Sequence, residues 1–407
     1  MNKIQEINIQ DFDYPLPDNR IAKYPLENRS DSKLLHYSKG QISNKRFTDI
    51  VDLFLPNDLW VVNNTKVIPA RLHFKKSTGA IIEIFCLEPL QMDYTQALSQ
   101  RQSVIWKCFV GGAKKWKDGA LNLTIVVNDK EVILSAECLE KIENAFIIEF
   151  KWDGPTFSEI LDAVGELPIP PYLNRDTEPE DYDRYQTLFA ETSGSVAAPT
   201  ASLHFDEKVL DAIKQKGVTK MSLTLHVGAG TFKPVNTAQL GDHVMHAEYF
   251  EVSRDLIERW VKQWQNSGRL IVVGTTALRT LESIFWIAHE NLIPDDNGLF
   301  HVGQWLPYER KEDKETLLVM EELLSKMIKN NWDKIVGTTQ IIIGPSYQIK
   351  TADVLITNFH QPKSTLLLLV YAVVGSDWRK IYQHALEQEY RFLSYGDSSW
   401  LETKKAP

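Results

Sequence analysis

Histidines are concentrated in one part of the chain, where they could carry proton transfer. Four of the ten lie close together in sequence: His204 in APTASLHF, His226 in TLHVG, and His243 and His246 in GDHVMHAEYFE. An imidazole titrates near neutral pH, so histidine suits acid–base chemistry at pH 7 and is also a common metal ligand. This segment therefore predicts a site of proton transfer, hydrogen bonding or metal binding.

The metal alternative rests on His243, His246 and Glu248, because imidazole and carboxylate are the usual ligands of zinc and iron. No HExxH motif and no cysteine ligand accompanies them. We therefore expect proton-transfer or hydrogen-bonding histidines and no metal.

Two glycines, Gly228 and Gly230, follow an apolar alternating run in TLHVGAGTFKPV, with Thr231 directly after them. The segment lacks the GK[ST] ending of a phosphate-binding loop and the third glycine of a dinucleotide fingerprint. Two interpretations stay open: a plain tight turn, or a place where backbone approaches a ligand at the carboxyl end of a strand.

Polar residues also follow a later strand and a later helix. Caps and turns explain each cluster about as well as a binding site does, but their convergence on one sheet edge favours a site. The clusters are Asn358, His360 and Ser364 in ITNFHQPKSTLL, and Arg391, Ser394, Tyr395 and Asp397 in YRFLSYGD.

The elements that must position these residues alternate between strand and helix from about residue 156 onward. Capped amphipathic helices are predicted after Asp206, Ser253 and Ser364, and buried strands in RLIVVG, IIIG and DVLITN. Such alternation predicts a largely parallel or mixed sheet covered by helices. Two segments interrupt it: residues 174–184, an expected exposed loop, and residues 291–334, an expected insertion.

Residues 66–150 show a different pattern, with short strands separated by turn clusters such as GGAKKWKDG and NDK. Even spacing of short strands is typical of a small antiparallel barrel or sandwich. The sequence therefore predicts an α/β main domain and an inserted small antiparallel β domain.

Composition places the chain among globular proteins of two or three domains, with 407 residues, 43% hydrophobic and 24% charged. The longest apolar run, TLLLLVYAVVG, is about half of the roughly 20 residues that span a bilayer, so we expect no membrane segment. Three cysteines without a CxxC pair argue against a disulfide framework and a structural zinc site. We expect a cytoplasmic protein.

The net charge of −9 excludes a protein coated by nucleic acid but allows a local basic face. Solvated surface is the alternative explanation for each of the two basic clusters. One holds Lys66, Arg71, Lys75 and Lys76, and the other holds Lys114, Lys115 and Lys117 beside Trp106 and Trp116.

Longer motifs carry a resemblance to a known family. The chain resembles the S-adenosylmethionine:tRNA ribosyltransferase-isomerase family in YQTLFAETSGSVAAPTASLHF, TLHVGAGTFKPV, DHVMHAEYFEV, VGTTALRTLES, TNFHQPKSTLLLLV and YRFLSYGD. Near the start of the chain, the same family is resembled by FDYPLP, IAKYPLENR and DLWVVNNTKVIPARL. The motifs occur in order and cover most of the chain apart from the middle strands and residues 291–334.

The resemblance implies an enzyme of queuosine biosynthesis. Such an enzyme moves the ribosyl part of S-adenosylmethionine onto 7-aminomethyl-7-deazaguanine at the wobble position of tRNA with a GUN anticodon, giving epoxyqueuosine, adenine and methionine. S-adenosylmethionine would be a substrate, and no cofactor is expected. The implied fold is an α/β catalytic domain, residues 1–65 together with 155–407, carrying a β-barrel at 66–154; we expect a monomer.

This chemistry needs a base beside the sulfonium-acidified ribose carbon and an acid for the leaving adenine. The resemblance implies that the acid and the base come from four histidines: His204, His226, His243 and His246. It also implies that Glu248 orients one of them, and that Gly228, Gly230 and Thr231 form a wall of the pocket.

Arg279 and Glu282 either pair with each other or hold the methionine part. The remaining predicted substrate contacts are Ser202, Thr275, Thr276, Asn358, His360, Ser364, Arg391, Tyr395 and Asp397, with Phe359, Tyr390, Phe392 or Tyr395 stacking on the wobble base. Lys66, Arg71, Lys114, Lys115 and Lys117 are predicted to contact tRNA.

The chain departs from the family pattern at defined positions. Ser202 and Ser346 stand where glycine is expected, Lys66 where arginine is expected, and Gln361 where leucine is expected. Two alternatives therefore stay open: a divergent S-adenosylmethionine-using transferase with another acceptor, or a catalytically silent tRNA-binding relative.

Overall fold

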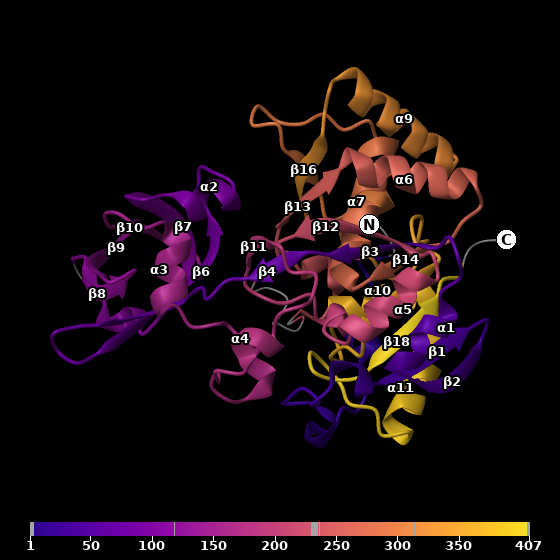
Figure 1. Cartoon of the computed structure of the whole chain (residues 1–407), viewed down its shortest axis with the longest axis horizontal. Helices are drawn as coiled ribbons and strands as arrows, with labels where there is room; N and C mark the ends of the chain where they lie inside the picture. Colours follow the sequence, from indigo (N-terminus) through magenta and orange to yellow (C-terminus); the bar gives the residue numbers. More distant parts are fainter. Residues whose placement is uncertain (1–3, 118, 229–234, 236, 312–313, 405–407) are drawn as a thin grey trace.

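A computed structural model of the chain describes residues 4–117, 119–228, 235, 237–311 and 314–404. Figure 1 shows two parts: a small six-stranded sheet with its own helices, and a larger α/β domain that contains both ends of the chain.

The main sheet contains ten strands in the order β15-β16-β13-β12-β3-β14-β17-β18-β1-β2 among the described residues. Its centre is parallel: β12 runs alongside β3, β3 alongside β14, and β14 alongside β17. Antiparallel neighbours follow on both sides, so the sheet is mixed. The strands are β1 (Lys33–Ser38), β2 (Gln41–Arg46), β3 (Leu59–Asn63), β12 (Thr219–Leu225), β13 (Glu248–Ser253), β14 (Leu270–Val273), β15 (Phe300–Val302), β16 (Lys334–Thr339), β17 (Val354–Asn358) and β18 (Ser398–Glu402).

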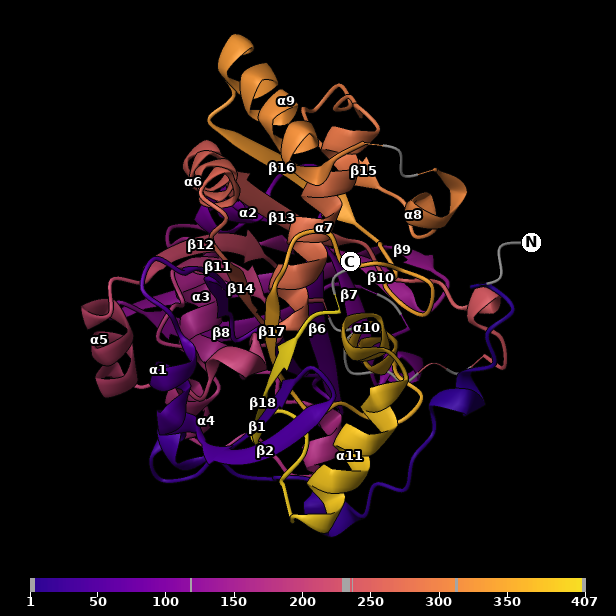
Figure 2. The ribbon, with the colours of Figure 1, turned by 90° about the vertical axis from the view of Figure 1, so that its right-hand side faces the viewer.

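Helices cover both faces of the sheet, which is why its central strands are apolar throughout. Val61 of β3 packs into the core on one face, whereas Trp60 and Val62 pack into the core on the other. In Figure 2, α5 and α1 lie on one side of the sheet and α7 and α10 on the other. The helices are α1 (Ile50–Leu53), α5 (Glu207–Gln215), α6 (Arg254–Gln265), α7 (Thr275–His289), α8 (Leu306–Glu309), α9 (Thr316–Lys329), α10 (Thr365–Val374) and α11 (Trp378–Glu387).

Three predicted helix starts are confirmed by their caps. The side chains of Asp206, Ser253 and Ser364 accept hydrogen bonds from the backbone N–H groups of Val209, Leu256 and Leu367. Each bond satisfies one of the N–H groups that the first turn of a helix leaves unpaired.

The smaller sheet is antiparallel, in the order β5-β6-β7-β10-β9-β8, and its edge strands β5 and β8 approach each other as in a nearly closed barrel. Phe74, Trp106 and Phe150 fill its interior. The predicted fold class, a mixed α/β domain with a small antiparallel barrel, is therefore confirmed. Its strands are β5 (Arg71–Lys75), β6 (Ile81–Pro89), β7 (Ser103–Gly111), β8 (Leu121–Val127), β9 (Lys130–Ile142) and β10 (Ala145–Lys151), with α2 (Tyr94–Ser99) and α3 (Phe157–Val164) against them.

One local prediction is wrong: residues 341–344 are buried but form no strand. They follow β16, which ends at Thr339, and β15 forms this edge of the sheet. Residues 174–184 are mostly exposed, as predicted, but they include the short helix α4 (Asp181–Arg184), whose Asp181 is buried in an ion pair with Arg175. A short parallel pair, β4 (Thr65–Val67) and β11 (Thr192–Ser195), lies where the chain enters the barrel.

The six barrel strands span residues 71–151, inside the predicted domain limits of 66 and 154. Residues 291–334 hold β15, α8 and α9. Where the domain boundaries fall, and whether 291–334 is an insertion, stay predictions.

Candidate functional site

A cavity of about 420 Å³ lies at the carboxyl edge of the parallel strands. It is lined by residues that follow β12, β14 and β17 and by Glu248, which begins the antiparallel strand β13 at the same edge. Open α/β sheets bind ligands at this edge because the strand-to-helix turns meet there. We call this space the main cavity.

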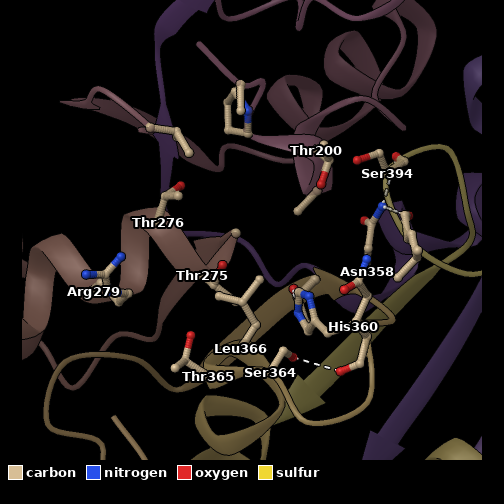
Figure 3. Close-up of a pocket in the computed structure, with 18 of the residues that line it drawn as sticks. Thr200, Thr275, Thr276, Arg279, Asn358, His360, Ser364, Thr365, Leu366 and Ser394 are labelled. Atoms are coloured by element: carbon tan, nitrogen blue, oxygen red, sulfur yellow. Dashed lines mark hydrogen bonds between the residues drawn. The ribbon is translucent and has the colours of Figure 1, made fainter. Parts of the chain in front are cut away.

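Many of the predicted site residues line the main cavity. Figure 3 shows several of them, with Thr275, Thr276 and Arg279 on α7 facing Asn358, His360 and Ser364. They are His243, His246, Glu248, Thr275, Thr276, Arg279, Asn358, His360 and Ser364, and Phe359 from the predicted stacking residues.

Two helices begin at the main cavity. Gly274 precedes α7 with a φ of +91°, a conformation that favours glycine, and Thr275 and Thr276 form its first turn. Ser364 caps α10, and Thr365 follows it in the wall. The unpaired N–H groups of helix starts attract anions, so this side of the cavity suits a carboxylate.

A buried ion pair forms another wall. Arg279 Nη1 donates to a Glu248 carboxylate oxygen, and the two residues are only 7% and 6% exposed. Arg279 Nε donates to the Ile341 carbonyl at 3.3 Å, and Gly228 N donates to Glu248 at 3.4 Å. Arg279 Nη2 is buried with no hydrogen-bond partner within the described residues.

Glu282, the predicted alternative partner of Arg279, lies outside the main cavity. Its carboxylate accepts hydrogen bonds from the Tyr347 hydroxyl at 2.5 Å and the Thr351 hydroxyl at 2.6 Å. The backbone N–H groups of Lys350 and Thr351 donate to it as well. Burial raises its pKa. These contacts describe a buried brace between α7 and the chain at 347–351, not a ligand contact.

His204 also lies outside the main cavity, and both of its ring nitrogens are occupied. Nε2 is 2.9 Å from Asn358 Oδ1, and Nδ1 is 2.9 Å from the Ser32 hydroxyl. The Asn358 amide group donates to the carbonyls of Leu393 and Ser394, which assigns Oδ1 to face the histidine, so Nε2 carries the proton. Burial lowers the pKa of His204 to about 4. In this arrangement His204 positions Asn358.

His226 lies between the main domain and the barrel. Its Nδ1 is 2.8 Å from the Thr65 hydroxyl, and its ring is 4.3 Å from that of Tyr94 on α2, centroid to centroid. Tyr249 stacks on it at 5.8 Å. Burial lowers the pKa of His226 to about 3, so the ring is neutral and packed at this interface.

Three histidines do face the main cavity: His243, His246 and His360. Burial lowers the pKa of His360 to about 4 and also lowers the pKa of His243. His360 Nε2 bonds the Thr357 hydroxyl at 3.0 Å, and Nδ1 has no partner in the described part of the chain. A neutral imidazole can accept a proton, and a pKa of about 4 makes His360 a weaker base than an exposed histidine.

The other predicted ligand contacts lie behind the cavity wall or beyond the described residues. Asp397 is buried and accepts from the backbone N–H groups of Lys33 and Arg391, and the Tyr395 hydroxyl donates to Asp181. Ser202 is fully buried. Gly228 is described, but Gly230 and Thr231 lie outside the described residues.

None of the four aromatic residues predicted to stack on a base is exposed; Phe359, Tyr390, Phe392 and Tyr395 are buried. Ser394, which the sequence places in the YRFLSYGD cluster, also lines the main cavity. Sequence reasoning missed several other cavity residues, among them Thr200, Met245 and Thr357. All three stand within the motifs quoted above, and that position was the only signal available for them.

The predicted basic clusters lie on and beside the barrel. Lys114, Lys115 and Lys117 are exposed after β7, and Lys66 is exposed on β4. Arg71 is half-buried, with its guanidinium 5.3 Å from the centre of the Phe85 ring.

The described residues hold no group of three or more histidine, cysteine, aspartate or glutamate residues arranged to bind a metal ion. Nor does any described helix combine the length and apolarity needed to cross a membrane.

Fold and cavity together define a class: a mixed α/β protein with an inserted antiparallel barrel and a ligand cavity at the carboxyl edge of its sheet. A family model described as "Queuosine biosynthesis protein" matches residues 9–401. The chain belongs to this family.

Similar proteins carry the name S-adenosylmethionine:tRNA ribosyltransferase-isomerase. That of Dichelobacter nodosus is 38% identical over 399 residues, covering 96% of this chain and 95% of the relative. That of Vesicomyosocius okutanii is 37% identical, covering 97% and 98%. The crystal structure of the S-adenosylmethionine tRNA ribosyltransferase of Thermotoga maritima is 28% identical, with a TM-score of 0.46, and the match covers 96% of this chain and 99% of that one.

Proposed function

We propose that this protein is an S-adenosylmethionine:tRNA ribosyltransferase-isomerase that acts on 7-aminomethyl-7-deazaguanine at the wobble position of tRNA with a GUN anticodon. S-adenosylmethionine is consumed as a substrate and no cofactor takes part. The protein acts in the cytoplasm as a monomer. The observation that carries the proposal is the main cavity, with its two helix starts and its buried Arg279–Glu248 pair.

The main cavity matches the parts of S-adenosylmethionine. Its volume of about 420 Å³ lies within the roughly 300–1,000 Å³ range of small-molecule sites. The helix starts suit the methionine carboxylate, and the paired side chains of Arg279 and Glu248 bring a positive and a negative group to the same cavity wall. A cavity holding both an anionic and a cationic contact favours a zwitterionic nucleoside over a nucleotide.

His360 is the histidine that we assign as proton acceptor. It lines the cavity, its burial keeps it neutral at pH 7, and Nδ1 is unoccupied in the described part of the chain. His243 and His246 lie on the same cavity and are the candidates for the acid that meets adenine. His204 and His226 hold the surrounding structure in place.

The barrel, proposed to span residues 66–154, contributes to tRNA binding through exposed lysines. Changing Lys114, Lys115 and Lys117 together to glutamate should weaken tRNA binding and flatten its salt dependence. A salt slope equal to that of the wild type would remove these lysines from the interface.

The direct test combines the protein, S-adenosylmethionine and tRNA carrying 7-aminomethyl-7-deazaguanine, and follows adenine and the new nucleoside by mass spectrometry. The proposal requires both products. Adenine release that needs another acceptor, or tRNA binding without turnover, would contradict it and support a divergent transferase or a silent relative.

A further inference from the structure

A second, smaller cleft lies directly behind the main cavity and is lined by three arginines. Its volume is about 20 Å³, and its walls include Pro25, Leu26, His204 and Tyr395. The arginines come from distant parts of the chain: Arg29, Arg184 and Arg391. We call this the arginine cleft.

The three guanidinium groups are anchored mainly by backbone carbonyls. Arg29 donates to Gln186 O at 2.7 Å and to Asp183 O at 2.8 Å. Arg184 donates to the carbonyls of Leu26 and Glu27, and Arg391 donates to Tyr24 O at 3.4 Å. Carbonyl oxygens orient a guanidinium but do not neutralise its charge.

Acidic partners are scarce around these arginines. Arg391 Nε is 3.9 Å from Asp397, whose two oxygens already accept two backbone N–H groups. Within the described residues, Arg29 and Arg184 form no ion pair; the carboxylate of Asp183 near Arg29 is exposed. Arg184 Nε is buried without a hydrogen-bond partner in the described part of the chain. His204 in the cleft wall is neutral, so it provides no negative charge to balance the arginines.

Like charges that are held close together without counter-charges repel each other and raise the free energy of the folded protein. A bound anion removes this repulsion. The mutual repulsion is visible in Arg29, whose pKa is lowered by burial and by the charge of Arg184. A phosphate oxygen fits the small volume, and the guanidinium fork matches the geometry of phosphate.

The arginine cleft adjoins the main cavity. Ser394 lines both spaces, and His204 in the cleft wall bonds Asn358 in the cavity wall. Beside the cleft, Tyr24 is 51% exposed, and its hydroxyl donates to Glu178. The guanidinium of Arg175, paired with Asp181, lies 4.5 Å from the centre of the Tyr24 ring. Arginines beside an exposed aromatic ring are typical of surfaces that bind single-stranded RNA.

We infer that the arginine cleft binds a backbone phosphate of the tRNA strand whose wobble base enters the main cavity. The inference rests on the proposed function and adds the anchor that holds the strand while its base is extruded. The exposed ring of Tyr24 beside the cleft favours a phosphodiester within a strand over free phosphate, because the neighbouring base can stack there.

The mutational test uses Arg391→Gln, because Arg391 has the weakest anchoring bonds of the three. We expect the KM for tRNA to rise about tenfold and the salt slope of tRNA binding to fall by about 0.7, the value for one phosphate contact on a single strand. The KM for S-adenosylmethionine should not change. The matched control is Arg259→Gln, which removes an exposed arginine paired with Asp255 on α6.

A second measurement avoids substitutions and therefore any effect on folding. Phenylglyoxal modification of arginines in the wild-type protein is mapped by mass spectrometry with and without tRNA. We expect tRNA to protect Arg29 and Arg391 but not Arg259. Equal protection by inorganic phosphate at matched phosphate concentration would make this a free-anion site and overturn the inference.

The two proposals fail separately. A wild-type protein that forms no product overturns the proposed function. Product formation without protection of Arg29 and Arg391, or with an unchanged salt slope in Arg391→Gln, overturns the role of the arginine cleft.

Discussion

Two groups of histidines lie around the same edge of the sheet, and they differ in what their ring nitrogens do. His204 bonds Ser32 and Asn358 and is not among the residues that line the main cavity. His360 uses one nitrogen for Thr357 and lines the cavity with the rest of its ring. Both have pKa values lowered to about 4 by burial, so pKa alone does not separate them. What separates them is that His360 has a ring nitrogen without a partner in the described residues and lines the main cavity, whereas His204 does neither.

The largest expected effect tests that difference directly. His360→Gln should lower kcat by about 10²–10⁴, the usual contribution of a positioned proton acceptor. Single-turnover adenine release measures it. His204→Gln, as the comparison, keeps hydrogen-bonding groups and should alter kcat far less; an equal loss in both variants would erase the distinction.

The next effect concerns the buried ion pair. Arg279→Met leaves Glu248 as an uncompensated buried charge and should destabilise the fold by about 3–5 kcal/mol. Urea unfolding measures the change. The double variant Arg279→Met with Glu248→Gln removes that charge and should recover part of the stability but none of the activity; recovered activity would show that the pair has no role in substrate binding.

Acid should destabilise the protein through its buried histidines. His204, His226 and His360 have pKa values of about 4, 3 and 4 when folded, against an ordinary value of about 6.5 when unfolded. The unfolded chain therefore binds more protons below pH 6.5, and stability is lost as pH falls from about 6.5 towards 4. Each histidine contributes on the order of 3 kcal/mol to this loss. Thermal unfolding across this range measures it, and His204→Gln should flatten the profile.

The smallest effect comes from the two serines at expected glycine positions. Ser346 has a φ of +71°, which glycine adopts without strain, so Ser346→Gly should stabilise the protein by about 1 kcal/mol. Ser202 is not among the residues with positive φ, and Ser202→Gly should give no such gain. Thermal melts compare the two; a gain at both positions or at neither would contradict the backbone explanation.

Local signals in the sequence predicted the elements well, because caps and periodicity depend on near neighbours. Asp206, Ser253 and Ser364 cap helices by bonding residues only three positions ahead. The strand-to-helix alternation likewise placed Thr275 and Asn358 at one edge of the sheet.

The roles of individual site residues were harder to predict, because their partners are distant in sequence. His204 bonds Ser32, 172 positions away, and His226 bonds Thr65, 161 positions away. Arg279 pairs with Glu248 on β13 and not with Glu282, which lies one turn along its own helix. Residue type and motif identified the right part of the molecule, but only packing decides which nitrogen or oxygen is left for a ligand.

The contact of Tyr94 with His226 has a mechanical consequence. Gly194 lies against both rings so closely that an added Cβ would be 2.8 Å from each. This joint therefore has no room for a side chain at position 194. Even the methyl group of an alanine would have to push apart the two rings through which α2 of the barrel contacts His226 of the main domain.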